Sequence, residues 1–98
     1  MTIKKETQGT AVTLSVEGRL DTISAPQLEA EIKALGNVTD LTVDFSALEY
    51  VSSAGLRVLL GAQKKMNEFG KMRVTNVNSD IMDVLEITGF TDILTIVD

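Results

Sequence analysis

Apolar and polar residues alternate along several short stretches of this chain, and such alternation predicts strands with one buried face. The stretch from Leu41 to Phe45 illustrates the pattern, because Leu41, Val43 and Phe45 alternate with Thr42 and Asp44. The predicted strands are residues 2–7, 10–16, 41–45, 72–76 and 93–97. A hairpin-like junction separates the first two, which predicts that they pair with each other.

The stretches between the later strands carry apolar residues at helical spacing. The first predicted helix begins at Ser24, which together with Gln27 fits a capping box, and Pro26 is tolerated in its first turn. Gly36 ends this helix. Its buried face is predicted to consist of Ala25, Leu28, Ile32 and Leu35.

The second predicted helix begins near Ser53 and ends at Gly70, and a third precedes Gly89. The buried face of the second is predicted to hold Gly55, Val58, Leu59, Ala62, Met66 and Phe69. Leu56 and Leu60 fall on the shoulder of that face, where they either pack beneath a neighbouring helix or face a partner. Candidate caps for the third helix are Asn78, Ser79 and Asp80.

The predicted order of elements is β-β-α-β-α-β-α-β. Strands that are separated by helices favour parallel pairing through right-handed crossovers, whereas the opening pair is expected to be antiparallel. The sequence therefore predicts an α/β fold, in which helices pack on a mixed, mostly parallel sheet. A length of 98 residues fits one domain that spans residues 1–98.

Composition narrows the possible functions. The formal net charge is −5, which argues against binding nucleic acid, because such binding depends on Lys and Arg that neutralise phosphates. The chain has no histidine and no cysteine, so a Ser-His-Asp system, His-ligated metals and thiolate metal sites are excluded. No phosphate-binding glycine loop is present, and we expect no cofactor, no metal and no enzymatic activity.

Hydropathy suggests where the protein works. Residues 1–11 do not resemble a signal peptide, and no apolar run approaches the roughly 20 residues that span a bilayer. We therefore expect a cytoplasmic protein that does not insert into membranes. An enzyme that uses Ser53 as nucleophile is disfavoured, because Lys64 and Lys65 lie about 16 Å further along the predicted helix.

Two adjacent hydroxyls, Ser52 and Ser53, stand where the chain passes from a strand into a helix N-terminus. The first N–H groups of a helix lack internal partners and this end carries partial positive charge. A serine there either caps the helix or receives and displays an anionic group, and the pattern alone leaves both roles open. Gly55 permits a close approach, and Leu56 and Arg57 follow it.

Asp21 is a further candidate, on a loop that leaves a different strand. Loops at the carboxyl ends of parallel strands share one edge of the sheet, where binding sites collect. The Asp21 loop and the Ser52-Ser53 turn are therefore expected to be neighbours if their strands run parallel. A residue in this position also commonly serves only the local turn, so this role of Asp21 remains an alternative.

Residues 44–46 and 50–60, with sequences DFS and YVSSAGLRVLL, resemble the signature of STAS domains, specifically the bacterial anti-sigma factor antagonists. The segment Gly18-Arg19-Leu20-Asp21 resembles the second characteristic stretch of that family, and the resemblance extends over the whole chain. It implies a STAS-like fold and a regulatory role. In such proteins the unphosphorylated form binds an anti-sigma factor that is also a serine kinase, so that the sigma factor is released.

The resemblance also implies which residues act. Aligning Gly55-Leu56 with the family's Gly-Leu places the phosphoacceptor at Ser53, with Ser52 as second choice. The position before the acceptor is usually Asp in the family but Ser52 here, and Ala54 replaces the usual Ser or Thr. The partner-binding residues would be Asp21, Ser52, Ser53, Gly55, Leu56 and Arg57. A PP2C-type phosphatase would restore the unmodified form.

A second function is compatible with the same resemblance. The chain could be a STAS accessory subunit of a membrane transport system, which docks onto the transporter's ATPase without any phosphorylation switch. Substitutions at Ser53 distinguish the two functions, because only the switch depends on charge at that position.

Overall fold

The computed structural model describes residues 1–97, which form three α-helices, a 3-10 helix and six strands. The strands are β1 (Thr2–Gln8), β2 (Ala11–Leu20), β3 (Asp40–Asp44), β4 (Leu48–Val51), β5 (Lys71–Thr75) and β6 (Ile96–Val97). The helices are α1 (Ala25–Lys33), α2 (Ser53–Phe69), α3 (Ser79–Ile87) and the 3-10 helix η1 (Phe90–Asp92). The predicted α/β class is confirmed.

The sheet is mixed, with the order β1-β2-β3-β5-β6, and β4 pairs with β2. The pair β1–β2 is antiparallel and every other pair is parallel, as expected. The long strand β2 changes partner along its length: residues 11–15 pair with β3 and residues 18–20 pair with β4. The register shifts between Gly18 and Arg19, where Gly18 has a φ of 93° that favours glycine.

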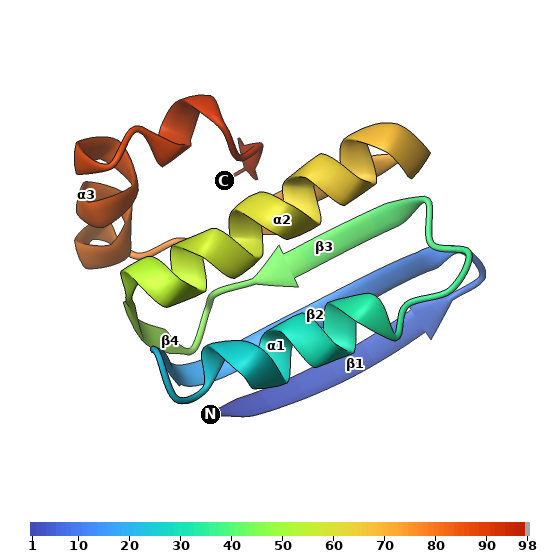
Figure 1. Ribbon diagram of the computed structural model, residues 1–98, viewed down its shortest axis with the longest axis horizontal. Coiled ribbons are helices and arrows are strands. Elements are labelled where there is room, and N and C mark those ends of the chain that lie inside the picture. Colours follow the sequence, from blue (N-terminus) through green and yellow to red (C-terminus); the bar gives the residue numbers. More distant parts are fainter. Residues whose placement is uncertain (98) are drawn as a thin grey trace.

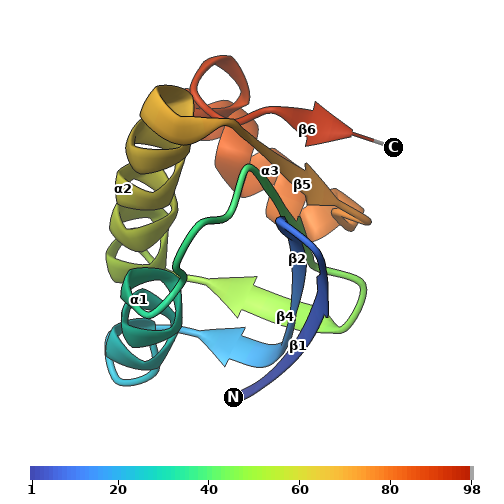
Figure 2. The same ribbon diagram turned by 90° about the vertical axis from the view of Figure 1, so that its right-hand side faces the viewer.

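The helices α1 and α2 lie together on one face of the sheet, whereas α3 lies beside β4 at one end of the molecule (Figures 1 and 2). The apolar residues of the alternating strands are buried as predicted, and Leu14, Val43 and Phe45 have no exposed surface. The predicted face of α1 is likewise buried, at Ala25, Leu28, Ile32 and Leu35. The sheet and these two helices therefore enclose most of one apolar core, to which α3 adds Ile81 and Leu85.

The buried face of α2 differs from the prediction. It consists of Gly55, Leu56, Leu59, Ala62, Gln63 and Met66. Leu56 is thus part of the core, while Phe69, expected to be buried, has 63% of its surface exposed. Gln63 is the one buried polar side chain in residues 1–97; it donates to Asn67 at 2.9 Å and accepts from the N–H of Thr95 at 3.4 Å.

Three strands also differ from the prediction. The strand β4 was not predicted, because only Leu48 and Val51 of its four residues are buried and the sequence shows no alternation. The strand β2 extends to Leu20 rather than residue 16, and the last predicted strand shortens to β6 because η1 precedes it. Of the three candidate caps for α3, Asn78 holds the position, where its side chain accepts from the N–H of Ile81 at 2.9 Å.

The strand β1 forms one edge of the sheet and is exposed along nearly its whole length. It carries Lys4, Lys5 and Glu6, and Lys4 forms an ion pair with Glu17 of β2 at 3.2 Å. No helix within residues 1–97 is long and apolar enough to cross a membrane.

Candidate functional site at the start of α2

Ser52 caps α2. The strand β4 ends at Val51, and Ser52 adopts an extended backbone conformation with φ −97° and ψ 174°. Its Oγ accepts a hydrogen bond from the N–H of Gly55 at 3.3 Å, and its carbonyl accepts from the N–H of Leu56 at 2.9 Å. Ser52 therefore fills the capping role that serine favours, and one of the two roles left open by the sequence belongs to it.

Ser53 is the first helical residue, and its environment is different. The residue is exposed, and its hydroxyl makes no hydrogen bond to any other residue of the described range 1–97. The first turn of α2 contains no acidic side chain. The Ser53 hydroxyl is thus free, accessible and close to the positive end of a 17-residue helix.

The loop that contains Asp21 lies directly beside this turn. In the parallel pair β2–β4, Leu20 is opposite Val51, and the N–H of Ser52 donates to the carbonyl of Leu20 at 2.8 Å. The residues that follow these two positions, Asp21 and Ser52, therefore leave the same edge of the sheet as neighbours. This arrangement confirms the expected juxtaposition, although the strand that produces it is β4 rather than residues 41–45.

The Asp21 carboxylate is occupied within its own turn. It accepts hydrogen bonds from the N–H groups of Ile23 and Ser24, both at 3.0 Å, and from the Ser24 hydroxyl at 3.1 Å. The hydrogen bond from the Ser24 backbone is the main reason that the pKa of Asp21 lies below its ordinary value. Arg19 adds a weaker favourable interaction at 3.8 Å. These bonds identify a structural role for Asp21; the contact with a partner stays a prediction.

The predicted capping box of α1 is wrong. Ser24 occupies the N-cap position, but its side chain makes no cap hydrogen bond and instead accepts from the N–H of Asp21 at 2.9 Å and donates to the carbonyl of Arg19 at 2.7 Å. A cap serine accepts from the second or third helical N–H, and Pro26 removes one of these donors. The N–H of Gln27 is already bonded to the Ser24 carbonyl.

Gly55 allows the start of α2 to pack closely against β2. A Cβ atom at this position would lie 2.7 Å from Cγ of Leu20 and 3.0 Å from its carbonyl oxygen, so the glycine allows helix and strand to approach closely. Gly55 is buried. Among the residues predicted to bind a partner, Gly55 therefore contributes by positioning the helix and offers no surface for direct contact.

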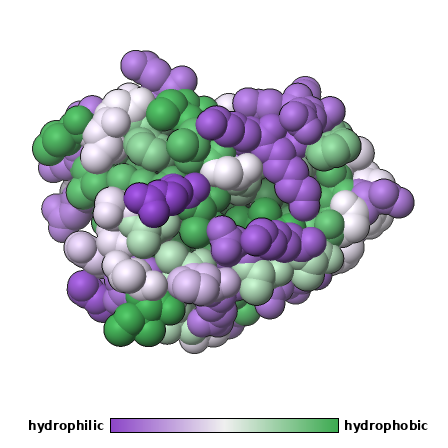
Figure 3. Space-filling view, viewed as in Figure 1, coloured by the Kyte–Doolittle hydropathy of each residue, from purple (hydrophilic) through white to green (hydrophobic). Residues whose placement is uncertain are grey.

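Leu56 and Arg57 lie beside Ser53 in a shallow apolar hollow. It has a volume of about 280 Å³ and is lined by Ser53, Leu56, Arg57, Leu60, Thr88 and Phe90. Leu56 is only 5% exposed and forms part of the hollow's wall, whereas Arg57 is exposed. The space-filling view shows hydrophobic surface at the α3 end of this face, with hydrophilic side chains over the middle (Figure 3). The hollow thus places a free hydroxyl next to apolar surface between α2 and α3.

Three further residues at this edge were not predicted from the sequence. The Arg19 guanidinium stacks over the ring of Tyr50, 4.2 Å from its centroid, because the short strand β4 places Tyr50 opposite Arg19. Ile23 is 91% exposed in the adjacent turn. A strand assignment for residues 48–51 would have revealed the Arg19–Tyr50 pair, but nothing in the local pattern marked Ile23.

The sequence model of the STAS domain matches residues 2–98. The chain belongs to the STAS domain family. Among its relatives is a protein of Bordetella bronchiseptica that is named "Putative anti-sigma factor antagonist BtrV". The two sequences are 33% identical over 81 residues, which covers 80% of this chain and 70% of BtrV.

Solved STAS structures share the fold. An anti-sigma factor antagonist from Mycobacterium paratuberculosis superposes with a TM-score of 0.87 at 26% identity, covering 97% of this chain and 83% of that one. The Bacillus cell fate determinant SpoIIAA, solved in its phosphorylated form, superposes with a TM-score of 0.77 at 20% identity, covering 99% and 92%. The second likeness concerns the fold alone.

The resemblance to the family predicts an Asp at the position that Ser52 occupies in this chain. The structure shows that Ser52 supplies the hydrogen bond that caps α2. Serine and aspartate are comparable caps, so the local conformation does not require the carboxylate. The departure therefore removes a negative charge beside Ser53 without removing the cap.

Proposed function

We propose that this STAS domain is an anti-sigma factor antagonist, whose unphosphorylated form binds an anti-sigma factor serine kinase and causes release of the sigma factor. Phosphorylation of Ser53 switches this binding off, and a PP2C-type phosphatase reverses the modification. The names of the relatives support the role of anti-sigma factor antagonist. The assignment of Ser53 as the phosphorylated residue rests on the different roles of two adjacent serines. Ser52 caps α2, whereas the Ser53 hydroxyl has no hydrogen-bond partner within residues 1–97.

In this reaction the Ser53 Oγ attacks the γ-phosphorus of ATP. An O–P bond forms, the bond between the γ-phosphorus and the bridging oxygen breaks, ADP leaves, and the hydroxyl proton passes to solvent or to a base of the kinase. In this reaction the domain acts as the substrate of the kinase and as its ligand, and the chain contains no histidine for a Ser-His-Asp system. Because the kinase uses ATP and the regulated protein is a sigma factor, we expect the domain to act in the cytoplasm.

The geometry of α2 supports a switch without refolding. A phosphate adds about −1.5 to −2 charges at pH 7. Within the domain, this charge lies at a helix N-terminus with no acidic residue in the first turn, and Arg57 stands one turn further along the helix. In a partner interface over the apolar hollow, the same charge must be desolvated. An unpaired interface charge costs roughly 2–5 kcal/mol, or about 30- to 5000-fold in affinity.

The direct test combines the purified kinase and ATP with mass mapping of the modified peptide. The wild-type chain and Ser52→Ala should each gain one phosphate at Ser53, whereas Ser53→Ala should gain none. Ser52→Ala is a matched control, because it changes the neighbouring hydroxyl and leaves the proposed acceptor in place. Phosphate on Ser52, or no phosphate while a known substrate is modified, would contradict the assignment.

Binding measurements test the switch itself. Phosphorylated protein and Ser53→Asp should bind the kinase more weakly than the wild type, and Ser53→Ala should keep the wild-type affinity. If neither substitution alters binding to the kinase, the phosphorylation switch is wrong. Unchanged docking of both variants onto a transporter ATPase would instead favour the accessory-subunit function.

A further inference from the structure

A cavity lies at the opposite end of α2 from Ser53. It has a volume of about 520 Å³, within the range of roughly 300–1,000 Å³ that small-molecule pockets occupy. The residues that line it are Thr10, Leu35, Gly36, Asn37, Val38, Thr39, Lys65, Met66 and Phe69. Since α2 has 17 residues, its two ends lie about 25 Å apart. This cavity is therefore separate from the proposed phosphorylation site.

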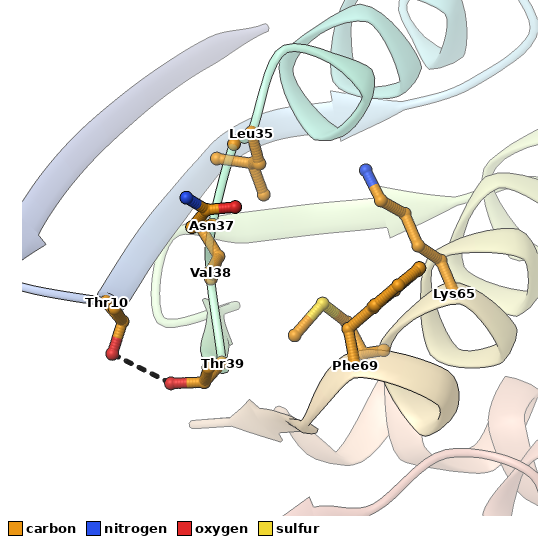
Figure 4. A pocket seen from close by; sticks show the side chains of 9 residues that line it. Thr10, Leu35, Asn37, Val38, Thr39, Lys65 and Phe69 are labelled. Carbon is orange, nitrogen blue, oxygen red and sulfur yellow. Dashed lines mark hydrogen bonds between the residues drawn. The ribbon is translucent and has the colours of Figure 1, made fainter.

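Two segments form the walls of the cavity. The connection between α1 and β3, residues 35–39, lies on one side, and Lys65 and Phe69 project from α2 on the other (Figure 4). Met66 of α2 also lines the cavity. The chain after α2 is fixed against the first segment, because the N–H of Lys71 donates to the carbonyl of Thr39 at 2.8 Å. The two segments that line the cavity are thus held together by a backbone hydrogen bond.

The interior of the cavity is mostly apolar. Met66 and Leu35 belong to the core and present only a small part of their surface, whereas Phe69 is 63% exposed. A large aromatic side chain that remains in water gains nothing from the hydrophobic effect until something covers it. The ring of Phe69 therefore offers apolar area that an occupant of the cavity can bury.

The lining of the cavity contains a basic side chain and no acidic one. The Lys65 ammonium donates to the carbonyl of Ile32 at 3.2 Å and forms no ion pair with a carboxylate of residues 1–97. None of the nine lining residues is acidic, although the chain as a whole has a net charge of −5. At the far side, the hydroxyl of Thr39 donates to that of Thr10 at 2.8 Å. The cavity thus combines one cation with apolar walls.

We propose that this cavity binds a monocarboxylate with an apolar body, such as a medium-chain fatty acid. The carboxylate pairs with the Lys65 ammonium, and the hydrocarbon chain covers Met66, Phe69 and Val38. A single lysine matches a single negative charge, and the walls offer no second cation for a doubly charged phosphate. This activity is independent of the phosphorylation switch, because it uses neither Ser53 nor the hollow beside it.

The first test is an NMR titration of the ¹⁵N-labelled full chain with octanoate, hexanoate and octanol, each below its aggregation limit. Octanoate should shift the amides of residues 35–39 and 65–70 in a saturable manner. Hexanoate should bind about tenfold more weakly, because two fewer methylenes are buried. Shifts that are absent from these residues, or octanol that binds as tightly as octanoate, would overturn the proposal.

Two neighbouring lysines provide a matched pair of variants. Lys65→Gln should weaken octanoate binding about fivefold or more and leave octanol binding unchanged, whereas Lys64→Gln, on the exposed side of α2, should change neither. Val38→Trp, which fills the cavity, should abolish binding of both. Equal effects of the two lysine variants, or full binding by Val38→Trp with an otherwise native spectrum, would contradict the assigned site.

Discussion

Two strand-to-helix turns lie side by side at one edge of this sheet, and they use similar residues in opposite ways. In the Asp21 turn, residues 21–24, the Ser24 hydroxyl and the Asp21 carboxylate bond to each other and to their own backbone. In the Ser52–Ser53 turn, Ser52 caps α2 and the Ser53 hydroxyl has no partner within residues 1–97. One turn is closed on itself, and the other presents a group to the outside.

The difference shows that a serine at a helix start has no fixed role. Ser24 and Ser52 both occupy the N-cap position, yet only Ser52 caps its helix. Pro26 removes a donor that Ser24 could use, and Asp21 provides a competing partner upstream. The closed turn then acts as a fixed support for its neighbour, because the N–H of Ser52 is bonded to the carbonyl of Leu20, just before that turn.

We expect the largest loss of stability from Gly55→Ala, which would push the start of α2 away from Leu20 and so away from the Asp21 turn. The added methyl would meet Cγ and the carbonyl oxygen of Leu20, which cannot both move away cheaply. We expect overpacking to lower the free energy of unfolding by about 1–3 kcal/mol, measured by urea denaturation.

Gly61→Ala is the control for this change. Gly61 lies in the same helix, and a Cβ atom there would meet nothing within 4 Å. Alanine should therefore raise the free energy of unfolding by about 0.5–1 kcal/mol through its higher helix propensity. If both glycine variants were stabilised, the close approach of α2 to Leu20 would not be a constraint on the fold.

A smaller effect should distinguish the two serines. Ser52→Ala removes the cap of α2 and should lower the free energy of unfolding by about 1 kcal/mol. Ser53→Ala removes an exposed hydroxyl without a partner in residues 1–97 and should change it by no more than about 0.5 kcal/mol. Thermal or urea unfolding of the two variants provides the comparison. Equal losses would mean that both hydroxyls serve the helix, and the proposed division of labour would fail.

The smallest expected effect concerns the closed turn and depends on pH. Folding lowers the pKa of Asp21 below its ordinary value of 3.8, so the folded state favours the ionised carboxylate. The resulting stabilisation is fully present above the unfolded-state pKa and is lost as the pH falls through the folded-state pKa. The stability difference between the wild type and Asp21→Asn should therefore shrink below about pH 4.

Urea midpoints measured for both proteins across this acidic range would check the prediction. Contributions from the other carboxylates are common to both proteins and cancel in the difference. Two curves that stay parallel down to the lowest pH at which the protein folds would show that the hydrogen bonds to Asp21 do not stabilise the fold through its charge.

Much of the fold follows from the periodicity of the sequence. Buried residues at every second position specify β2 and β3, and the spacing of Leu28, Ile32 and Leu35 specifies the inner face of α1. The parallel arrangement then brings the Asp21 and Ser52–Ser53 turns to one edge. The motif around Ser53 was sufficient to identify the family and to predict Ser53 as the candidate phosphoacceptor.

Other features depend on tertiary contacts that no local pattern encodes. The strand β4 has four residues and gains its structure by pairing with the end of β2, so periodicity could not detect it. Phe69 was expected in the core because of its position on the helix, but α2 reaches the 35–39 segment there and its ring lies over a cavity. The side-chain bonds of Ser24 depend on Asp21, which precedes the helix.

The exposed strand β1 has a consequence for how this domain meets other proteins. An open sheet edge can add strands from another chain, which leads to indiscriminate association, and charged side chains on the edge discourage this. Lys4, Lys5 and Glu6 lie at the centre of β1 and act in this way. Backbone pairing at this border is therefore disfavoured, which agrees with the proposal that the domain recognises its partner through side chains at the start of α2.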